Sequence, residues 1–190
     1  TARAAGVPAE RWVLPRVLVE SSASLSLSRR AEPHRWPAMG VLADAARRHL
    51  GRPLDQVEHL ELYSCFPAAV RVQQRELGLP PDGTPTLTGG MAFAGGPFNN
   101  FTYQATAAVV RAVREDRGSL GMVTTVSGLL TKPGLAVWST DPGEQEPLVA
   151  DLAEEATVAT ATTDVCGEAS GPARVVTYTV AYDGTAPRTA

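Results

Sequence analysis

The segment that decides the fold runs from residue 89 to residue 115 and reads GGMAFAGGPFNNFTYQATAAVVRAVRE. It opens with a glycine-rich turn and continues into an expected helix over 101–115. Between Ala105 and Val113, apolar and mostly small residues cover nearly the whole circumference of this helix. A helix of that kind is buried on all sides. We therefore expect a further layer of protein, outside this chain, to cover it.

The flanking segments predict alternating strands and helices. Two further helices are expected, over 38–50 and 67–77, each with a proline in its first turn and a glycine after its end. The expected strands before residue 140 are 12–20, with a break or bend at Pro15, and 59–63, 119–126 and 135–138. Alternation of strands and helices is typical of a layered α/β domain.

The last third of the chain has a different composition. From Asp141 to Glu168 there are eight acidic residues and no basic one, which is typical of a solvated connection. The segments 156–162 and 175–182 alternate as strands do. Asp183 and Gly184 form a hairpin-turn signal for which we expect no partner strand in this chain.

Composition excludes several classes of protein. The 190 residues are 44% hydrophobic and carry a net charge of −3, which is typical of a globular protein and not of one that binds nucleic acid or a membrane surface. No apolar run approaches the roughly 18 residues of a membrane helix. Two cysteines are too few for a disulfide scaffold and fit a reducing compartment, so we expect a cytoplasmic protein. The start lacks both an initiator Met and a signal-peptide pattern, and we expect a fragment of a longer chain.

The glycine-rich turn is the first candidate site. Gly90 and Gly95 have the spacing of a phosphate-binding loop, but Gly96-Pro97 stands where that loop needs Lys-Ser/Thr, so nucleotide hydrolysis is rejected. Two interpretations remain open. The turn could place an anion or oxyanion at the N-terminus of the next helix. Alternatively, its glycines only permit tight packing of a strand on a helix.

Other catalytic signals are sparse. His34, His49 and His59 are not spaced with cysteines or carboxylates as metal ligands are, so we expect no metal site. No Gly-x-Ser-x-Gly elbow supplies a serine nucleophile. Cys65 follows a short strand and precedes a helix, where α/β sheets bind ligands, although an inert structural thiol fits the same pattern.

Three blocks together resemble the C-terminal half of thiolase-fold proteins: LYSCFP at 62–67, GGMAFAGGPFNN at 89–100 and VSGLLTK at 126–132. The most similar branch is that of the sterol-carrier-type, thiolase-like acetyl-CoA acetyltransferases of actinobacteria. The resemblance spans about 1–140 and implies an α/β thiolase-like half, a mixed sheet with helices on both faces. An acidic linker over 141–155 and the start of a small, truncated β domain over 156–190 would follow.

The resemblance implies a function for the parent protein and a site for it. Such proteins act on acyl-CoA thioesters in bacterial lipid metabolism, with coenzyme A or acyl-CoA as a substrate and no permanently bound cofactor. The backbone N–H groups of Gly96 and Gly128 would receive the thioester oxygen, and Cys65 or Tyr63 would transfer protons. The binding residues would be Gly95, Pro97, Asn99, Asn100, Ser127 and Gly128. The implied partners are the N-terminal thiolase half, which holds the nucleophilic cysteine, and a second copy or an OB-fold protein.

The sequence also departs from the family pattern. Gly96 stands where thiolases have the histidine of Gly-His-Pro, and Val126 stands where they have a proton-shuttling cysteine. Two alternatives therefore stay open beside an acyltransferase. One is a thiolase-fold aldol lyase that cleaves β-hydroxyacyl-CoA, with Tyr63 as acid or base. The other is a catalytically degenerate module that binds CoA or lipid. Under each of them we expect the isolated fragment to be inactive.

Overall fold

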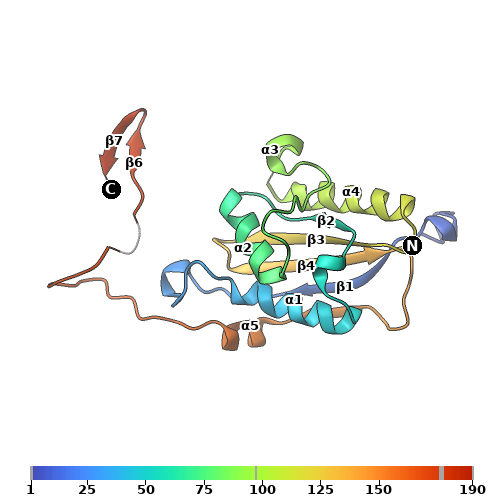
Figure 1. Cartoon of the computed structure of the whole chain (residues 1–190), viewed down its shortest axis with the longest axis horizontal. Helices are drawn as coiled ribbons and strands as arrows, with labels where there is room; N and C mark the ends of the chain where they lie inside the picture. The colour runs from blue at the N-terminus through green and yellow to red at the C-terminus, as the bar shows by residue number, and fades with distance from the viewer. Residues whose placement is uncertain (1, 97, 176–177, 190) are drawn as a thin grey trace.

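A computed structural model describes residues 2–96, 98–175 and 178–189 of the chain. Its centre is a five-stranded sheet with the strand order β2-β3-β4-β1-β5 (Figure 1). The strands are β1 (Leu14–Glu20), β2 (His59–Glu61), β3 (Leu120–Ser127), β4 (Lys132–Ser139) and β5 (Leu148–Asp151). β4 is antiparallel to both β1 and β3, whereas β5 is parallel to β1 and β2 is parallel to β3. The sheet is therefore mixed.

Helices cover both faces of this sheet. The main ones are α1 (Pro37–Leu50), α2 (Pro67–Leu77) and α4 (Phe101–Glu115), and the short ones are α3 (Met91–Ala94) and α5 (Ala153–Ala159). α1 packs on β1 and β4 and also contacts α2 and α5, while α4 packs on β2, β3 and β4 from the other side (Figure 1). The expected α/β architecture, a mixed sheet between helices, is confirmed.

The helix ends follow their local signals. α1 and α2 both begin at a proline, and each is followed by a glycine in the left-handed region, Gly51 with φ +66° and Gly78 with φ +68°. The strand expected over 12–20 forms as β1, and its register with β4 shifts between Pro15 and Val17, because proline has no N–H to donate to the ladder.

The sheet separates two apolar cores. The larger one joins α1 to the sheet through residues such as Met39, Leu42, Val17 and Met122, all fully buried. The smaller one lies under α4, whose side chains at 101, 105, 109 and 113 are buried at a spacing of four residues. Each core thus uses one face of every strand that it contacts.

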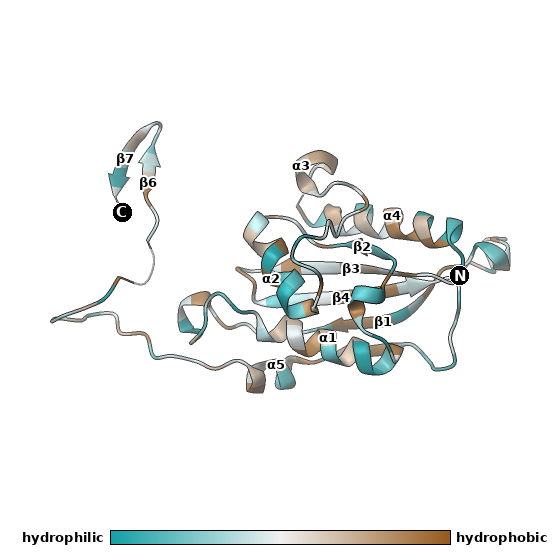
Figure 2. Ribbon diagram, in the orientation of Figure 1, coloured by the Kyte–Doolittle hydropathy of each residue, from teal (hydrophilic) through white to brown (hydrophobic). Residues whose placement is uncertain are grey.

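Within this chain α4 is buried on one side only, and the further layer expected outside the chain stays a prediction. Only the four-residue stripe that begins at Phe101 is buried, and Tyr103 is 75% exposed. Figure 2 shows hydrophobic and hydrophilic segments alternating along α4. The reason is that the helix has one packing partner among the described residues, the sheet beneath it.

The segment expected as a strand over 156–162 starts as a helix instead. β5 ends at Asp151, whose carboxylate accepts hydrogen bonds from Ser22 and, at 3.0 Å, from the Ala153 N–H at the start of α5. Ala156 is then buried against the core on α1. A tertiary contact and a capping carboxylate therefore override the weak alternation of small residues. The residues expected as an acidic connection, 141–155, contain all of β5.

The hairpin turn does have a partner strand, and the expectation that it lacks one was wrong. β6 (Ala181–Asp183) pairs antiparallel with β7 (Ala186–Thr189) across the turn at Gly184, which has φ +60°. Four residues after the turn suffice for a short ladder even though one of them is Pro187. In Figure 1 this red hairpin stands apart from the main sheet, at the end of an extended segment.

One buried carboxylate joins α2 to the start of α1. Glu76, with 4% of its side chain exposed, accepts hydrogen bonds from Arg35 at 2.7 and 3.0 Å and from the Trp36 N–H at 3.0 Å. Burial by itself raises the pKa of Glu76, but the bonds from Arg35 and Trp36 outweigh burial and hold the pKa below its ordinary value of 4.5. The folded protein therefore favours the charged form.

We expect Glu76→Gln to lower the free energy of unfolding at pH 7 by about 1–2 kcal/mol, because charged hydrogen bonds become neutral ones. A depressed carboxyl pKa stabilises the fold above the unfolded pKa, and this stabilisation is lost as the pH falls through the folded value. The difference between wild type and variant in urea unfolding should therefore be full at pH 7 and smaller at pH 3. An equal difference at both values would contradict it, and exposed Glu146→Gln is the control.

Candidate functional site

Cys65 and Gly128, two of the residues singled out in the sequence, line one pocket. The pocket has a volume of about 150 Å³ and lies between the start of α2 and the β3–β4 loop. Its lining residues are Leu27, Cys65, Phe66, Ala68, Ala69, Val126, Gly128, Leu129 and Leu130. Because β2 and β3 are parallel neighbours, the segments that follow them emerge at the same edge of the sheet. The sheet topology thereby brings Cys65 and Gly128, which are 63 positions apart in the sequence, into the same pocket.

The pocket is apolar and keeps its thiol protonated. Burial raises the pKa of Cys65, and hydrogen bonds to the backbone at Phe66 and Cys65 only partly offset this. Phe66 is 62% exposed and Leu129 is 69% exposed, so the mouth of the pocket carries bare apolar side chains. With its pKa raised, Cys65 is a neutral thiol at pH 7 and not an activated thiolate nucleophile.

Tyr63 lies just before this pocket and faces α4. Its ring meets that of Phe101 edge-on, with 5.6 Å between the ring centroids. Burial raises the pKa of the Tyr63 phenol, and the charge of Cys65 raises it further, which places the two groups within electrostatic reach of each other. Tyr63 is therefore also protonated at neutral pH.

Two residues that the sequence did not single out hold Tyr63 in place. The Tyr63 N–H donates to the Thr124 hydroxyl at 3.0 Å, and the Tyr63 carbonyl accepts from the Gln73 amide at 2.8 Å. Thr124 in turn donates to Gln73 at 2.6 Å, and both residues are buried. The sequence signal that could have pointed to this contact is Gln73, a polar residue on the buried side of α2, because buried polar groups are normally hydrogen-bonded.

The glycine-rich turn is anchored at its start. The buried carboxylate of Glu61 accepts four hydrogen bonds from residues 86–88, at 2.7 to 3.0 Å. Ser64 then accepts the Met91 N–H at 2.9 Å. Gly90 has φ +75°, and a Cβ there would lie 2.9 Å from the Ser64 hydroxyl, so this position requires glycine.

The later part of the turn lies at the surface. Gly95, Gly96, Asn99 and Asn100 are exposed, as is Ser127 on the other side of the site, and Pro97 is outside the described residues. Neither Gly95 nor Gly96 is among the lining residues of the pocket that contains Cys65. The structure thus brings Cys65 and Gly128 together and leaves the glycine turn as a separate exposed feature.

A wide groove of about 500 Å³ lies on the α4 side of the sheet. Thr102 and Thr106 of α4 form one wall, and residues of β1, β4 and β5 form its floor. Trp138 and Gln104 each have a buried polar atom without a hydrogen-bond partner in the described structure. Exposed Val149 and Tyr103 complete an apolar face that no described segment covers.

No group of three or more His, Cys, Asp and Glu side chains within 2–96, 98–175 and 178–189 could hold a metal ion. No helix in these ranges has both the length and the apolar character needed to cross a membrane.

Comparison with known proteins decides what fold this is. No protein-family model matches the chain, and no curated protein matches it. Among solved structures, it is similar to a monomeric SCP2-thiolase-like protein type 1 from Mycobacterium smegmatis, with 33% identity and a TM-score of 0.78 over 90% of this chain. The fold is thiolase-like. The chain spans 38% of the length of that protein, so the thiolase-like unit described here corresponds to part of it.

Proposed function

We propose that this thiolase-like chain is one half of an enzyme that acts on acyl-CoA thioesters as an acyltransferase of the acetyl-CoA acetyltransferase type. The observation that carries the proposal is the similarity over 90% of the chain, together with a pocket that contains Cys65 and Gly128 at the matching strand ends. A bacterial, cytoplasmic role in lipid metabolism belongs to the same proposal. Coenzyme A and its thioesters are the substrates.

The proposed chemistry uses protonated groups. The Gly128 N–H, in the pocket that contains Cys65, receives the thioester oxygen. Gly96 lies outside this pocket and is not assigned that role. Cys65 and Tyr63 both carry a proton at neutral pH, and burial raises the pKa of each further. In this proposal one of them transfers its proton to the leaving group or enolate. The nucleophile comes from a second half.

The side of α4 that faces away from the sheet is uncovered in the described structure, which supports the complementary thiolase half as the partner. The groove of about 500 Å³ beside α4 is lined by Trp138, whose buried indole Nε1 has no partner in the described structure, and by exposed Val149. Exposed apolar side chains grouped in this way are typical of an interface. We place the complementary thiolase half there.

Ligand binding tests the substrate class. Coenzyme A, acetyl-CoA, acetoacetyl-CoA and a long-chain acyl-CoA are added separately to the two-half protein, and thermal unfolding is followed. A ligand at about 100 times its Kd stabilises the folded state by about 2.7 kcal/mol, which in a two-half protein of roughly twice this length raises the Tm by about 3 °C. A flat Tm with all four compounds would remove acyl-CoA from the proposal. A ketone or aldehyde product, rather than a new thioester, would show an aldol lyase.

Substitution tests the named groups. In the two-half protein, Cys65→Ser and Tyr63→Phe are each expected to lower kcat about 100-fold or more if the group transfers the proton. Cys166→Ser is the matched control, because Cys166 is also a free, exposed cysteine. Turnover unchanged in both variants would exclude these roles while leaving the substrate class standing.

A further inference from the structure

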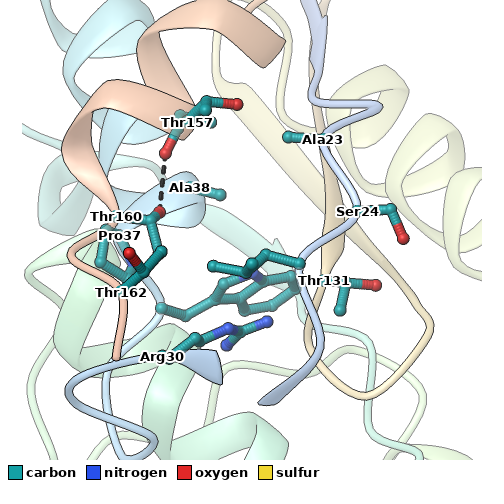
Figure 3. Close-up of a pocket in the computed structure, with 12 residues that line it drawn as sticks. Ala23, Ser24, Arg30, Pro37, Ala38, Thr131, Thr157, Thr160 and Thr162 are labelled. Carbon is teal, nitrogen blue, oxygen red and sulfur yellow. Dashed lines mark hydrogen bonds between the residues drawn. The ribbon is translucent and has the colours of Figure 1, made fainter. Parts of the chain in front are cut away.

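A second cavity, of about 160 Å³, lies on the opposite side of the sheet from α4, between the segment before α1 and the helix α5. Figure 3 shows it with Arg30 at one end, Ala38 and Thr160 on one wall and Ala23 and Thr131 on the other. The segment after α5 closes it, since the backbone of residues 161–163 pairs with that of 29–31. Segments far apart in the sequence therefore build this cavity, which is open to solvent at exposed Ser24, Thr157 and Thr162.

Arg30 brings an uncompensated positive charge to this cavity. The residue is 5% exposed, and its guanidinium donates to the carbonyl oxygens of Leu130 and Arg35. No carboxylate in the described ranges forms an ion pair with it. Burial lowers the pKa of Arg30, with no neighbouring acid to raise it, yet an arginine stays charged. A buried charge without a counter-ion is costly.

Trp36 brings an unused hydrogen-bond donor to the same cavity. The residue is 1% exposed and lines the cavity, and its indole Nε1 has no partner in the described structure. A buried donor left unpaired is costly. One unpaired indole N–H and one guanidinium without a counter-ion therefore line the same cavity.

The rest of the lining decides what kind of anion fits. The hydroxyls of Thr131, Thr157 and Thr160 already donate to backbone carbonyls, at 3.0, 2.7 and 2.6 Å. The other two hydroxyl residues of the lining, Ser24 and Thr162, are exposed to solvent and are not buried donors. Most of the remaining wall is apolar, with Ala38 and Ala156 among it. One guanidinium and one indole N–H match the single charge and two oxygens of a carboxylate. They leave a tetrahedral dianion such as phosphate with too few donors and half its charge unpaired.

We propose that this cavity binds a small organic monocarboxylate, with its carboxylate on Arg30 and Trp36 and its short hydrocarbon tail against the alanine wall. The size agrees, because an apolar cavity of about 150 Å³ holds benzene, which like butyrate has six non-hydrogen atoms. This site does not depend on acyl-CoA chemistry and lies apart from the pocket of Cys65, although the β3–β4 loop contributes to both.

Calorimetric titration of the 190-residue chain with butyrate, butyramide and inorganic phosphate tests the proposal. Butyrate should bind, while butyramide, which has the same shape without the charge, and phosphate should bind at least 10-fold more weakly. A chain that binds none of the three, or binds phosphate or butyramide as well as butyrate, overturns the proposal.

Variants locate the ligand. Arg30→Met should abolish butyrate binding, whereas Arg29→Met, at the exposed neighbouring arginine, should leave it unchanged. Trp36→Phe keeps an aromatic ring but removes the N–H, and should weaken binding about 10-fold. Circular dichroism checks that each variant is folded. If Arg30→Met does not fold, the Trp36→Phe result and the butyramide comparison decide, and equal affinity in wild type and Trp36→Phe overturns the proposal.

Discussion

Glu61→Ala is expected to lower the free energy of unfolding by about 2–4 kcal/mol, since each buried donor left without a partner costs about 1–3 kcal/mol. The Glu61 carboxylate is fully buried and accepts two backbone N–H groups and two threonine hydroxyls from residues 86–88. Alanine removes all four acceptor contacts and leaves a cavity. In a chain of this size the change corresponds to a Tm lower by roughly 5–15 °C.

A matched pair of variants separates this effect from a general change of charge. Glu61→Gln keeps the volume and one carbonyl oxygen, so its loss should be smaller than that of alanine. Glu146→Ala removes an exposed carboxylate and should stay within about 0.5 kcal/mol of wild type. Equal unfolding midpoints for Glu61→Ala and Glu146→Ala would show that the carboxylate does not anchor the glycine-rich turn.

Gly121→Val is expected to destabilise the fold by about 3 kcal/mol, the upper part of the range for an overpacked core. Gly121 lies in β3 under α4, and a Cβ there would clash with Val109 and lie 3.0 Å from Val113. Both neighbours are fully buried, and β-branched side chains in a helix have little rotamer freedom. The helix would have to move away from the sheet.

For the smaller substitution Gly121→Ala, the sign of the change in the free energy of unfolding tests the close contact. Without the clash, replacing glycine by alanine stabilises a protein by about 0.4–1 kcal/mol through the unfolded chain. We expect a loss of about 1–3 kcal/mol instead, measured by urea unfolding. Val109→Ala in the same chain should restore part of it, and Gly167→Ala, where a Cβ would meet nothing within 4 Å, is the control. A gain in stability for Gly121→Ala would refute the close approach of α4.

Local signals account for the part of the fold that could be predicted. α1 and α2 each begin at a proline and end before a glycine, and both residues can be recognised in the sequence. The helix over 101–115 was expected with the bounds that the structure shows. The three sequence blocks also indicated a thiolase-like fold, which the comparison with a solved structure bears out. The helix ends depend on residues within a few positions along the chain, and the thiolase-like fold was inferred from the similarity of three sequence blocks to a known family.

Contacts between distant residues account for what was missed. α5 forms where a strand was expected, because Ala156 finds a place against α1, and the hairpin at Gly184 closes on a partner strand of only four residues. For the candidate site, Tyr63, Cys65 and Gly128 were singled out from sequence. Gln73 and Thr124, which hold Tyr63, were not, because they are 51 residues apart along the chain.

The sequence by itself determined where the main helices begin and end and which residues could carry chemistry. Only the tertiary structure decided which of those residues meet. Cys65 shares a pocket with Gly128 because β2 and β3 are parallel neighbours. The cavity that Arg30 and Trp36 line is closed because the segment after α5 pairs with the segment that contains Arg30. The physical reason is that burial, and with it the pKa of a thiol or the cost of an unpaired donor, arises from side chains far apart in sequence and cannot be read from local pattern.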